Sequence, residues 1–251
     1  MPGLLPDVDP DGLLEYSVVF TDRSLNHMSR AFQQVMRDIS STLNKVYGAA
    51  ATVVVPGGGT YGMETIARQF AEQQKCLVVR NGYFSFRWSQ IIETGRLADD
   101  VTVIKARRQG EGPRAPFAPP PIEQVVSAIR SEKPGVVFAP HVDTSSGVLI
   151  PDDYIRAVAD AVHANGGLFV LDCVASGGAW VNMTDCGVDV LLSAPQKGWS
   201  ASPCAALVML SEAAVAVSYT HLRAHETRAF IAYAVVCLKR GGGGGGGGGG
   251  G

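Results

Sequence analysis

Short apolar runs alternate with helix-like segments along most of this 251-residue chain. The apolar runs lie at residues 51–55, 76–79, 101–105, 135–139, 167–171, 188–192 and 205–210. Helical segments are expected between them, near residues 61–74, 83–95, 122–131 and 152–164. Apolar runs this short, separated by helices, are typical of βαβ units in which helices cover both faces of a sheet. The sequence therefore predicts an α/β fold with a mostly parallel central sheet.

An apolar stripe at helical spacing precedes the first of these runs. It predicts a helix over residues 25–46, after an amino-terminal arm at residues 1–24. A proline-rich segment at residues 113–121 is expected to be a loop. The stripe consists of Met28, Phe32, Val35, Met36, Ile39 and Leu43.

The carboxy-terminal segment is interpreted as foreign to the fold. Residues 241–251 are all glycine, and residues 217–227 resemble the translation of a transposase-type sequencing adapter. We therefore treat residues 217–240 as a sequencing artefact and residues 241–251 as a polyglycine tail, and exclude both from fold reasoning. The alternative is a flexible glycine linker behind a genuine helix.

Composition narrows the class of protein. Without residues 217–251, the chain keeps 17 of its 21 basic and 22 of its 23 acidic residues, a balance that gives no indication of nucleic-acid binding. The sequence shows no secretion signal and no apolar run of about 18 residues, so we expect a cytoplasmic protein outside the membrane. The body has four cysteines, in neither paired nor metal-binding spacing, which predicts a reduced protein without a metal site. They are Cys76, Cys173, Cys186 and Cys204.

An aspartate and a lysine each follow a short apolar run. Asp172 ends the run at 167–171, and Lys197 lies 25 positions later, in a polar loop at residues 193–200. Both would project from the carboxyl ends of strands, where open α/β sheets bind their ligands. A lysine amine can hold an aldehyde as a Schiff base, and a carboxylate can keep a ring nitrogen protonated. The pair therefore predicts a pyridoxal phosphate enzyme.

A glycine-rich turn joins the first strand to the next helix. Residues 56–64 read Pro-Gly-Gly-Gly-Thr-Tyr-Gly-Met-Glu, which predicts a phosphate cradle at a helix amino end. Residues 57–62 also match G-x-G-x-x-G, so a dinucleotide-binding fold, as in an NADP-dependent oxidoreductase, is an alternative. The next strand ends Val79-Arg80-Asn81 without an acidic ribose ligand, although an arginine could serve a 2′-phosphate. Against the alternative, no Tyr-x-x-x-Lys pair occurs in the chain.

Each of these features alone has a structural explanation. A single lysine is usually solvated, a single aspartate often caps a turn, and an aromatic residue is usually part of the core. Their conjunction in this order, on a βα framework, favours the functional interpretation.

Together these residues resemble the fold-type I pyridoxal phosphate enzymes, and among them the class V aminotransferases similar to alanine–glyoxylate and serine–glyoxylate aminotransferases. The resemblance runs from about residue 22 to residue 210 and is most specific at Asp172-Cys-Val-Ala-Ser and Ser193-Ala-Pro-Gln-Lys-Gly. It implies that residues 25–216 form the large, cofactor-binding domain. It also implies ping-pong transamination between a small amino acid and a 2-oxo acid such as glyoxylate or pyruvate.

The resemblance assigns a role to each candidate site residue. Lys197 would form the internal aldimine with pyridoxal 5′-phosphate and move the substrate's α-proton, and Asp172 would pair with the ring nitrogen. Val174 and Phe84 would pack on the two ring faces. The remaining contacts would be Gly59, Thr60 and Gln196 to the phosphate and Ser145 near the phenolic oxygen.

The chain also departs from this pattern. Residues 1–16 lack the Asn-Pro-Gly-Pro segment that commonly opens these enzymes, and the body ends where a small carboxy-terminal domain, with the arginine for the substrate carboxylate, would begin. Because this small domain is missing from the body, we expect the chain as written to be a truncated, inactive product. The resemblance also implies that the intact enzyme is a homodimer. A cysteine desulfurase or related lyase is the nearest alternative, disfavoured because Gln196 stands where those enzymes have histidine.

Overall fold

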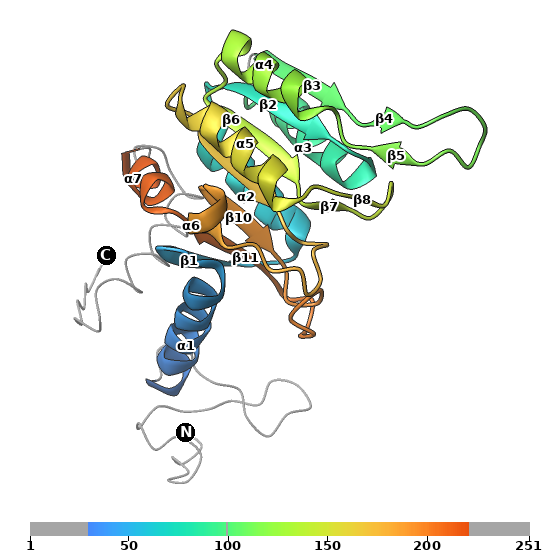
Figure 1. Ribbon diagram of the computed structural model, residues 1–251. Coiled ribbons are helices and arrows are strands. Elements are labelled where there is room, and N and C mark those ends of the chain that lie inside the picture. The colour runs from blue at the N-terminus through green and yellow to red at the C-terminus, as the bar shows by residue number, and fades with distance from the viewer. Residues whose placement is uncertain (1–29, 99, 221–251) are drawn as a thin grey trace.

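A seven-stranded sheet runs through the part of the chain that the computed structural model describes, residues 30–98 and 100–220 (Figure 1). The strand order is β1-β11-β10-β9-β6-β2-β3. The strands are β1 (Ala51–Pro56), β2 (Lys75–Arg80), β3 (Asp100–Lys105), β6 (Val136–Pro140), β9 (Leu168–Asp172), β10 (Val190–Ser193) and β11 (Ala205–Leu210).

Most neighbouring strands of this sheet are parallel. Strands β10, β9, β6, β2 and β3 pair in parallel, in register over pairs such as Val137 with Phe169 and Leu191 with Leu171. Strand β11 is the exception, because it pairs antiparallel with both β1 and β10. The predicted α/β fold with a mostly parallel sheet is therefore confirmed.

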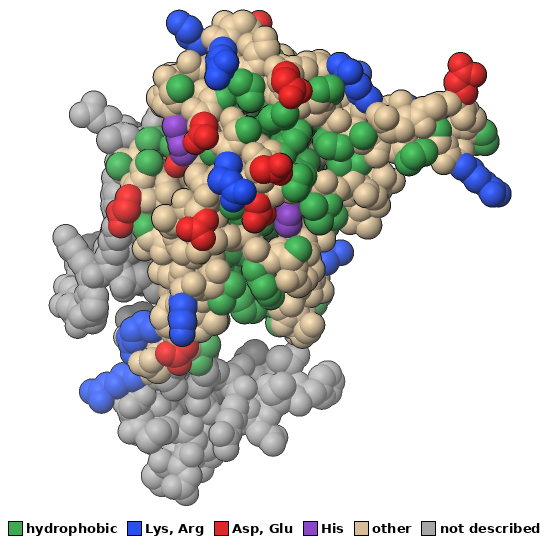
Figure 2. Space-filling view, in the orientation of Figure 1, with side chains coloured by type: hydrophobic (Ala, Val, Ile, Leu, Met, Phe, Trp, Pro, Cys, Tyr) green, Lys and Arg blue, Asp and Glu red, His purple; other side chains and the backbone are tan. Residues whose placement is uncertain are grey.

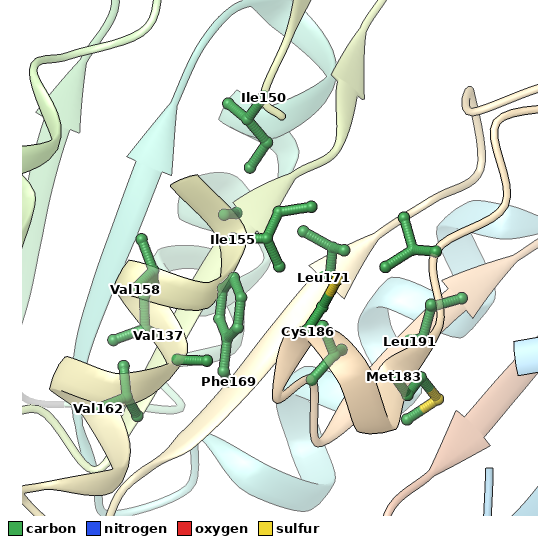
Figure 3. Close-up of a cluster of buried hydrophobic side chains, with 14 of the residues drawn as sticks. Val137, Ile150, Ile155, Val158, Val162, Phe169, Leu171, Met183, Cys186 and Leu191 are labelled. Carbon is green, nitrogen blue, oxygen red and sulfur yellow. The ribbon is translucent and has the colours of Figure 1, made fainter. Parts of the chain in front are cut away.

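Helices cover both faces of the sheet, because the strand side chains alternate between two apolar clusters. On β9, Phe169 and Leu171 belong to one cluster, which also contains side chains of α1, α4, α5 and α6 (Figure 3). Val170, between them, belongs to the other cluster, with side chains of α2, α3 and α7. The helices are α1 (Arg30–Tyr47), α2 (Gly59–Phe70), α3 (Tyr83–Gly95), α4 (Ile122–Glu132), α5 (Asp152–His163), α6 (Met183–Cys186) and α7 (Glu212–Thr220).

The structure differs from the expected elements in four details, one of which is the unexpected helix α7. The proline-rich loop contains β5 (Phe117–Ala118), which pairs with β4 (Arg107–Arg108). A second short ribbon joins β7 (Val142–Asp143) to β8 (Val148–Leu149), and the one-turn helix α6 was not expected. Two-residue strands and one-turn helices are too short to give a hydrophobic period, so the sequence pattern misses them.

Parts of the predicted domain organisation lie outside the described residues. These are the arm at residues 1–24, residues 221–240 and the glycine tail. Helix α7 continues across position 217, where we placed the start of the artefact. Most of the segment after that position lies outside the described residues, so the start of the artefact stays a prediction.

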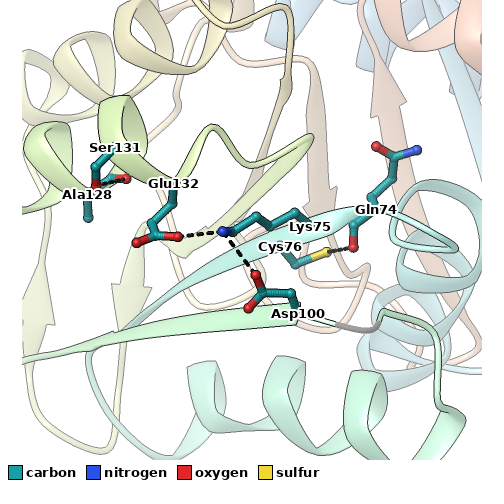
Figure 4. A network of polar contacts seen from close by, with 7 residues as sticks. All are labelled: Gln74, Lys75, Cys76, Asp100, Ala128, Ser131 and Glu132. Atoms are coloured by element: carbon teal, nitrogen blue, oxygen red, sulfur yellow. Dashed lines mark hydrogen bonds and ion pairs between the residues drawn. The ribbon is translucent and has the colours of Figure 1, made fainter.

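The amino edge of the sheet is held by an ionic cluster. Lys75 Nζ, at the start of β2, lies 2.9 Å from Asp100 Oδ2 of β3 and 2.5 Å from Glu132 Oε2 of α4 (Figure 4). The hydrogen bond that Lys75 donates to Glu132, followed by the one it donates to Asp100, raises the pKa of Lys75. These side chains are at the surface, where ion pairs add little stability, so the cluster contributes little to the stability of the fold.

The described part of the chain contains neither a membrane-spanning helix nor a cluster of metal-binding side chains. In this part of the chain, no helix is both long and apolar enough to cross a bilayer, and no group of three His, Cys, Asp or Glu side chains could hold a metal ion. On the face shown in Figure 2, basic side chains are scattered among acidic and apolar ones.

Helix α2 approaches the sheet closely because residue 62 has no side chain. A Cβ placed on Gly62 would lie 2.5 Å from Leu192 Cδ1 and 2.6 Å from Ala206 Cβ. Alanine in an exposed helix is more stable than glycine by about 1 kcal/mol. We expect the opposite sign here: Gly62→Ala should lower the free energy of unfolding by about 1–3 kcal/mol, because overpacking moves α2 away from the sheet.

Urea denaturation would measure this, with Gly58→Ala as the control. A Cβ on Gly58 meets nothing within 4 Å, so that variant should be nearly neutral. A stabilised Gly62→Ala would contradict the close packing of α2.

Candidate active site

The carboxyl ends of the central strands bring the candidate residues to one edge of the sheet. Asp172, the last residue of β9, is level with Pro140 at the end of β6 and with Leu192 in β10. The backbone N–H of His141 donates to the carbonyl oxygen of Asp172 over 2.9 Å. The loops after these strands therefore meet where α/β sheets bind ligands.

Asp172 is a buried carboxyl group without an ion-pair partner among the described residues. Its side chain is 7% exposed, and Oδ1 accepts a hydrogen bond from the N–H of Val174 over 3.0 Å. Burial raises the pKa of Asp172 to about 6. The hydrogen bond from the N–H of Val174 acts to lower that pKa, and the negative charge of Asp143 acts to raise it. The group would therefore gain from a cation placed beside it.

The glycine turn leaves the amino end of α2 open. The cap residue, Gly58, has no side chain to accept from the first helical N–H groups, and a Cβ placed on it would meet nothing within 4 Å. Gly57 has a φ of 118°, a conformation that favours glycine, and its N–H donates to Cys204 O over 2.9 Å. Uncapped N–H groups at a helix start bind anions, so this turn can hold a phosphate.

Val174 packs against the glycine turn. A Cβ on Gly59 would lie 3.2 Å from Val174 Cγ2 and 3.9 Å from Ala194 Cβ. The loop after β9 and the start of α2 are thus neighbours, as the predicted site requires.

The amino end of α3 is held by Asp143 through two serines. Ser145 Oγ donates to Asp143 Oδ1 over 2.6 Å, and the N–H of Tyr83 donates to Ser145 Oγ over 2.6 Å. The N–H and Oγ of Ser85 donate to Asp143 Oδ2 over 2.9 and 2.7 Å. Burial raises the pKa of Asp143, but the bonds from Ser145 and Ser85 outweigh it and hold the pKa below its ordinary value. A fully buried carboxylate therefore fixes Ser145 and the start of α3.

Lys197 lies on an exposed turn against the loop that follows Asp172. Its N–H donates to Ala194 O over 3.2 Å, and the backbone of Gly198 packs directly on the carbonyl of Gly177. Among the described residues, Lys197 Nζ forms no hydrogen bond or ion pair, and Gln196 Oε1 is buried without a partner. Both side chains therefore have free polar atoms beside the site.

Phe84 lies in the first turn of α3, with its ring 40% exposed. The ring makes an edge contact with Tyr83, at a centroid distance of 5.9 Å. Arg87 lies over both rings, and its Nη1 donates to Thr60 Oγ1 over 2.6 Å. The glycine turn and the aromatic pair are therefore linked.

Sequence reasoning assigned no role in the site to four polar groups at this edge, and it interpreted His141 and Asp143 as loop residues that satisfy backbone groups. Arg87 follows Phe84 at helical spacing, a signal that could have found it, while Asp143 reaches Ser85 across 58 residues and leaves no such signal. His141 Nδ1 lies 2.7 Å from Ser176 Oγ, and burial lowers the pKa of that imidazole. The indole Nε1 of Trp88 is buried and forms no hydrogen bond of normal geometry with the described residues. It nevertheless acts to lower the pKa of Asp172.

Comparison with known proteins gives a family match over most of the chain. The family model described as aminotransferase class V matches residues 13–222. An L-aspartate–glyoxylate aminotransferase of Paracoccus denitrificans is 30% identical over 195 residues, which cover 76% of this chain and 48% of the relative. An alanine–glyoxylate aminotransferase of Rattus norvegicus is 29% identical over 202 residues, which cover 79% and 46%. The chain thus spans about half the length of the curated relatives it matches.

Solved structures support the same fold. An alanine–glyoxylate aminotransferase from Nostoc sp. superimposes with a TM-score of 0.69 at 28% identity, covering 85% of this chain and 53% of that one. A pyridoxamine–pyruvate aminotransferase from Mesorhizobium loti gives a TM-score of 0.72 at 21% identity, covering 87% and 54%. The second likeness shows the fold alone.

The raised pKa of Asp172 predicts how the protein's stability depends on pH. The folded pKa of about 6 lies above the unfolded value of 3.8, so the folded protein binds the proton more tightly. Stability from this group is full below about pH 4 and is lost as pH rises to about 6. In Asp172→Asn this loss is absent, and the variant should be more stable than the wild type at pH 7, by on the order of 2 kcal/mol.

Denaturant titrations of both proteins between pH 4 and 8 measure the difference. Asp185→Asn, which changes an exposed carboxylate of α6, is the control and should follow the wild type. A constant offset between Asp172→Asn and the wild type at all pH values would show that Asp172 titrates normally.

Proposed function

Because the chain belongs to the class V aminotransferase family, we propose that it forms the cofactor domain of a pyridoxal phosphate-dependent aminotransferase. The reaction would move the amino group of a small amino acid to a 2-oxo acid such as glyoxylate or pyruvate. The buried carboxyl of Asp172, at a strand end and without a cationic partner among the described residues, carries this proposal.

The residues at this edge fit the cofactor's chemistry. Asp172 offers a buried negative charge to a protonated ring nitrogen, while the uncapped start of α2 offers N–H groups to a phosphate. The unpartnered Oε1 of Gln196 and the contact between Val174 and Gly59 support the proposal that these residues also contact the cofactor. The residues that would hold the cofactor are Gly59, Thr60, Phe84, Ser145, Asp172, Val174, Gln196 and Lys197.

The chemistry divides between Asp172 and Lys197. When bound, the cofactor supplies an electron-accepting ring. Asp172 would keep the ring nitrogen protonated, because its carboxylate is in a dry environment where the pairing is strong. Lys197 Nζ would bind the cofactor's aldehyde carbon and, once displaced by the amino donor, would move the donor's α-proton. One base would thus serve both halves of a ping-pong reaction.

The relatives support the choice of substrates. Two of them are named as glyoxylate aminotransferases, and the amino acids in their names are aspartate and alanine. We therefore propose glyoxylate as the first acceptor to test. A homodimer, with the substrate-carboxylate arginine supplied outside the described residues, completes the proposal. A likeness to the structure of a cysteine desulfurase, at 16% identity, shows the fold alone and does not support that alternative.

The first test is the attachment of the cofactor to Lys197. The 251-residue protein incubated with pyridoxal phosphate should absorb in the visible range, and borohydride should fix the cofactor on the peptide that contains Lys197. Lys197→Ala should abolish the label. Lys105→Ala, an exposed lysine at the carboxyl end of β3, should retain it. A label that persists in Lys197→Ala would overturn the assignment.

The second test is the protonation of the ring nitrogen. In the wild type, ¹⁵N NMR of ring-labelled cofactor should show a protonated nitrogen at pH 8, because Asp172 stabilises the cation. Asp172→Asn should show an unprotonated nitrogen. Where the wild type deaminates an amino donor, the variant should do so more slowly, by on the order of 10²-fold. A protonated nitrogen in that variant would mean that the carboxylate is structural.

A further inference from the structure

We propose that Arg87 supplies the positive charge of the phosphate site at the start of α2. The inference rests on the proposed function and extends it to a residue that the motifs did not single out. It makes Arg87 an anion-binding side chain for the cofactor's phosphate.

Arg87 is joined directly to the phosphate turn. Its Nη1 donates to Thr60 Oγ1 over 2.6 Å, which links α3 to the first turn of α2 across 27 residues of sequence. No other lysine or arginine in the described part of the chain forms a hydrogen bond with residues 57–60. The guanidinium therefore lies beside the open helix start, with further N–H donors to offer.

The charge of Arg87 is not neutralised by an acidic side chain in the described residues. Arg68 pairs with Glu64 over 2.7 Å, and Lys75 pairs with two carboxylates. Arg87 instead lies over the rings of Tyr83 and Phe84, at 5.7 and 5.5 Å from their centroids. Aromatic faces hold a guanidinium in place but leave its full charge and its donors available.

A phosphate monoester at this turn needs such a cation. It carries a charge of roughly −1.5 to −2 at neutral pH. The turn itself offers backbone N–H groups and a hydroxyl, and Gln196 offers a neutral amide. Charge-assisted hydrogen bonds from a guanidinium are roughly twice as strong as neutral ones. Arg87 therefore completes a site that otherwise lacks a full positive charge.

The same position connects the two ends of the proposed cofactor site. Arg87 lies close enough to Asp172 for its charge to oppose, weakly, the rise in the pKa of that carboxyl. Its ring contact with Phe84 also orients the aromatic side chain proposed to stack on the cofactor. Removing the charge would therefore weaken phosphate binding first and disturb the ring contact second.

The experiment compares two ligands that differ only in the phosphate. Dissociation constants of pyridoxal phosphate and of pyridoxal are measured by equilibrium dialysis for the 251-residue wild type, Arg87→Gln, Arg87→Lys and Arg68→Gln. We expect Arg87→Gln to weaken pyridoxal phosphate by about 10- to 100-fold. Pyridoxal binding should change by less than about twofold. Arg87→Lys should restore part of the loss, and Arg68→Gln should match the wild type.

The other outcomes overturn the inference. An equal loss for both ligands in Arg87→Gln, with Arg87→Lys no better, would mean that Arg87 acts through Phe84 or the fold. An unchanged constant for pyridoxal phosphate would mean that the phosphate binds elsewhere. If borohydride fixes the cofactor on Lys197 in all variants, these results contradict only the role of Arg87 and not the proposed function. A wild type that binds neither ligand would overturn the proposed function as well.

Discussion

The buried carboxyl of Asp172 is the interaction on which the candidate site depends. It lies at the end of a central strand, where burial raises its pKa to about 6. An isolated charge in such a place is costly, and a protein keeps one where a ligand or partner compensates it. The proposed cofactor would place a positive charge beside Asp172 and its phosphate at the start of α2. Lys197, on the adjoining turn, would then lie near its aldehyde.

Close backbone approaches hold these groups in place. Gly62 lets α2 lie on β10 and β11, Gly198 lets the lysine turn pack on the loop after β9, and Asp143 fixes the start of α3 through serine hydroxyls. None of these contacts is part of the chemistry. Each one, however, sets the position of an element that carries a proposed cofactor contact, so the site is built by the packing of the sheet.

Much of the fold could be predicted from the sequence, because buried parallel strands read as short apolar runs and the intervening helices have their own period. The Asp172 and Lys197 pair and the glycine turn could be found because each follows such a run. The placement of β11 between β1 and β10 could not, since both antiparallel pairings depend on the completed sheet. The bond between Arg87 and Thr60 could not be predicted either, because it exists only once α2 and α3 lie side by side.

A crystal structure of the 251-residue protein with pyridoxal phosphate bound would test the central claim most directly. We expect the ring nitrogen within hydrogen-bond distance of Asp172, with the phosphate against the first turn of α2 and the Arg87 guanidinium. A cofactor bound away from this edge, or one whose ring nitrogen faces solvent while Asp172 keeps only its bond from Val174, would contradict it.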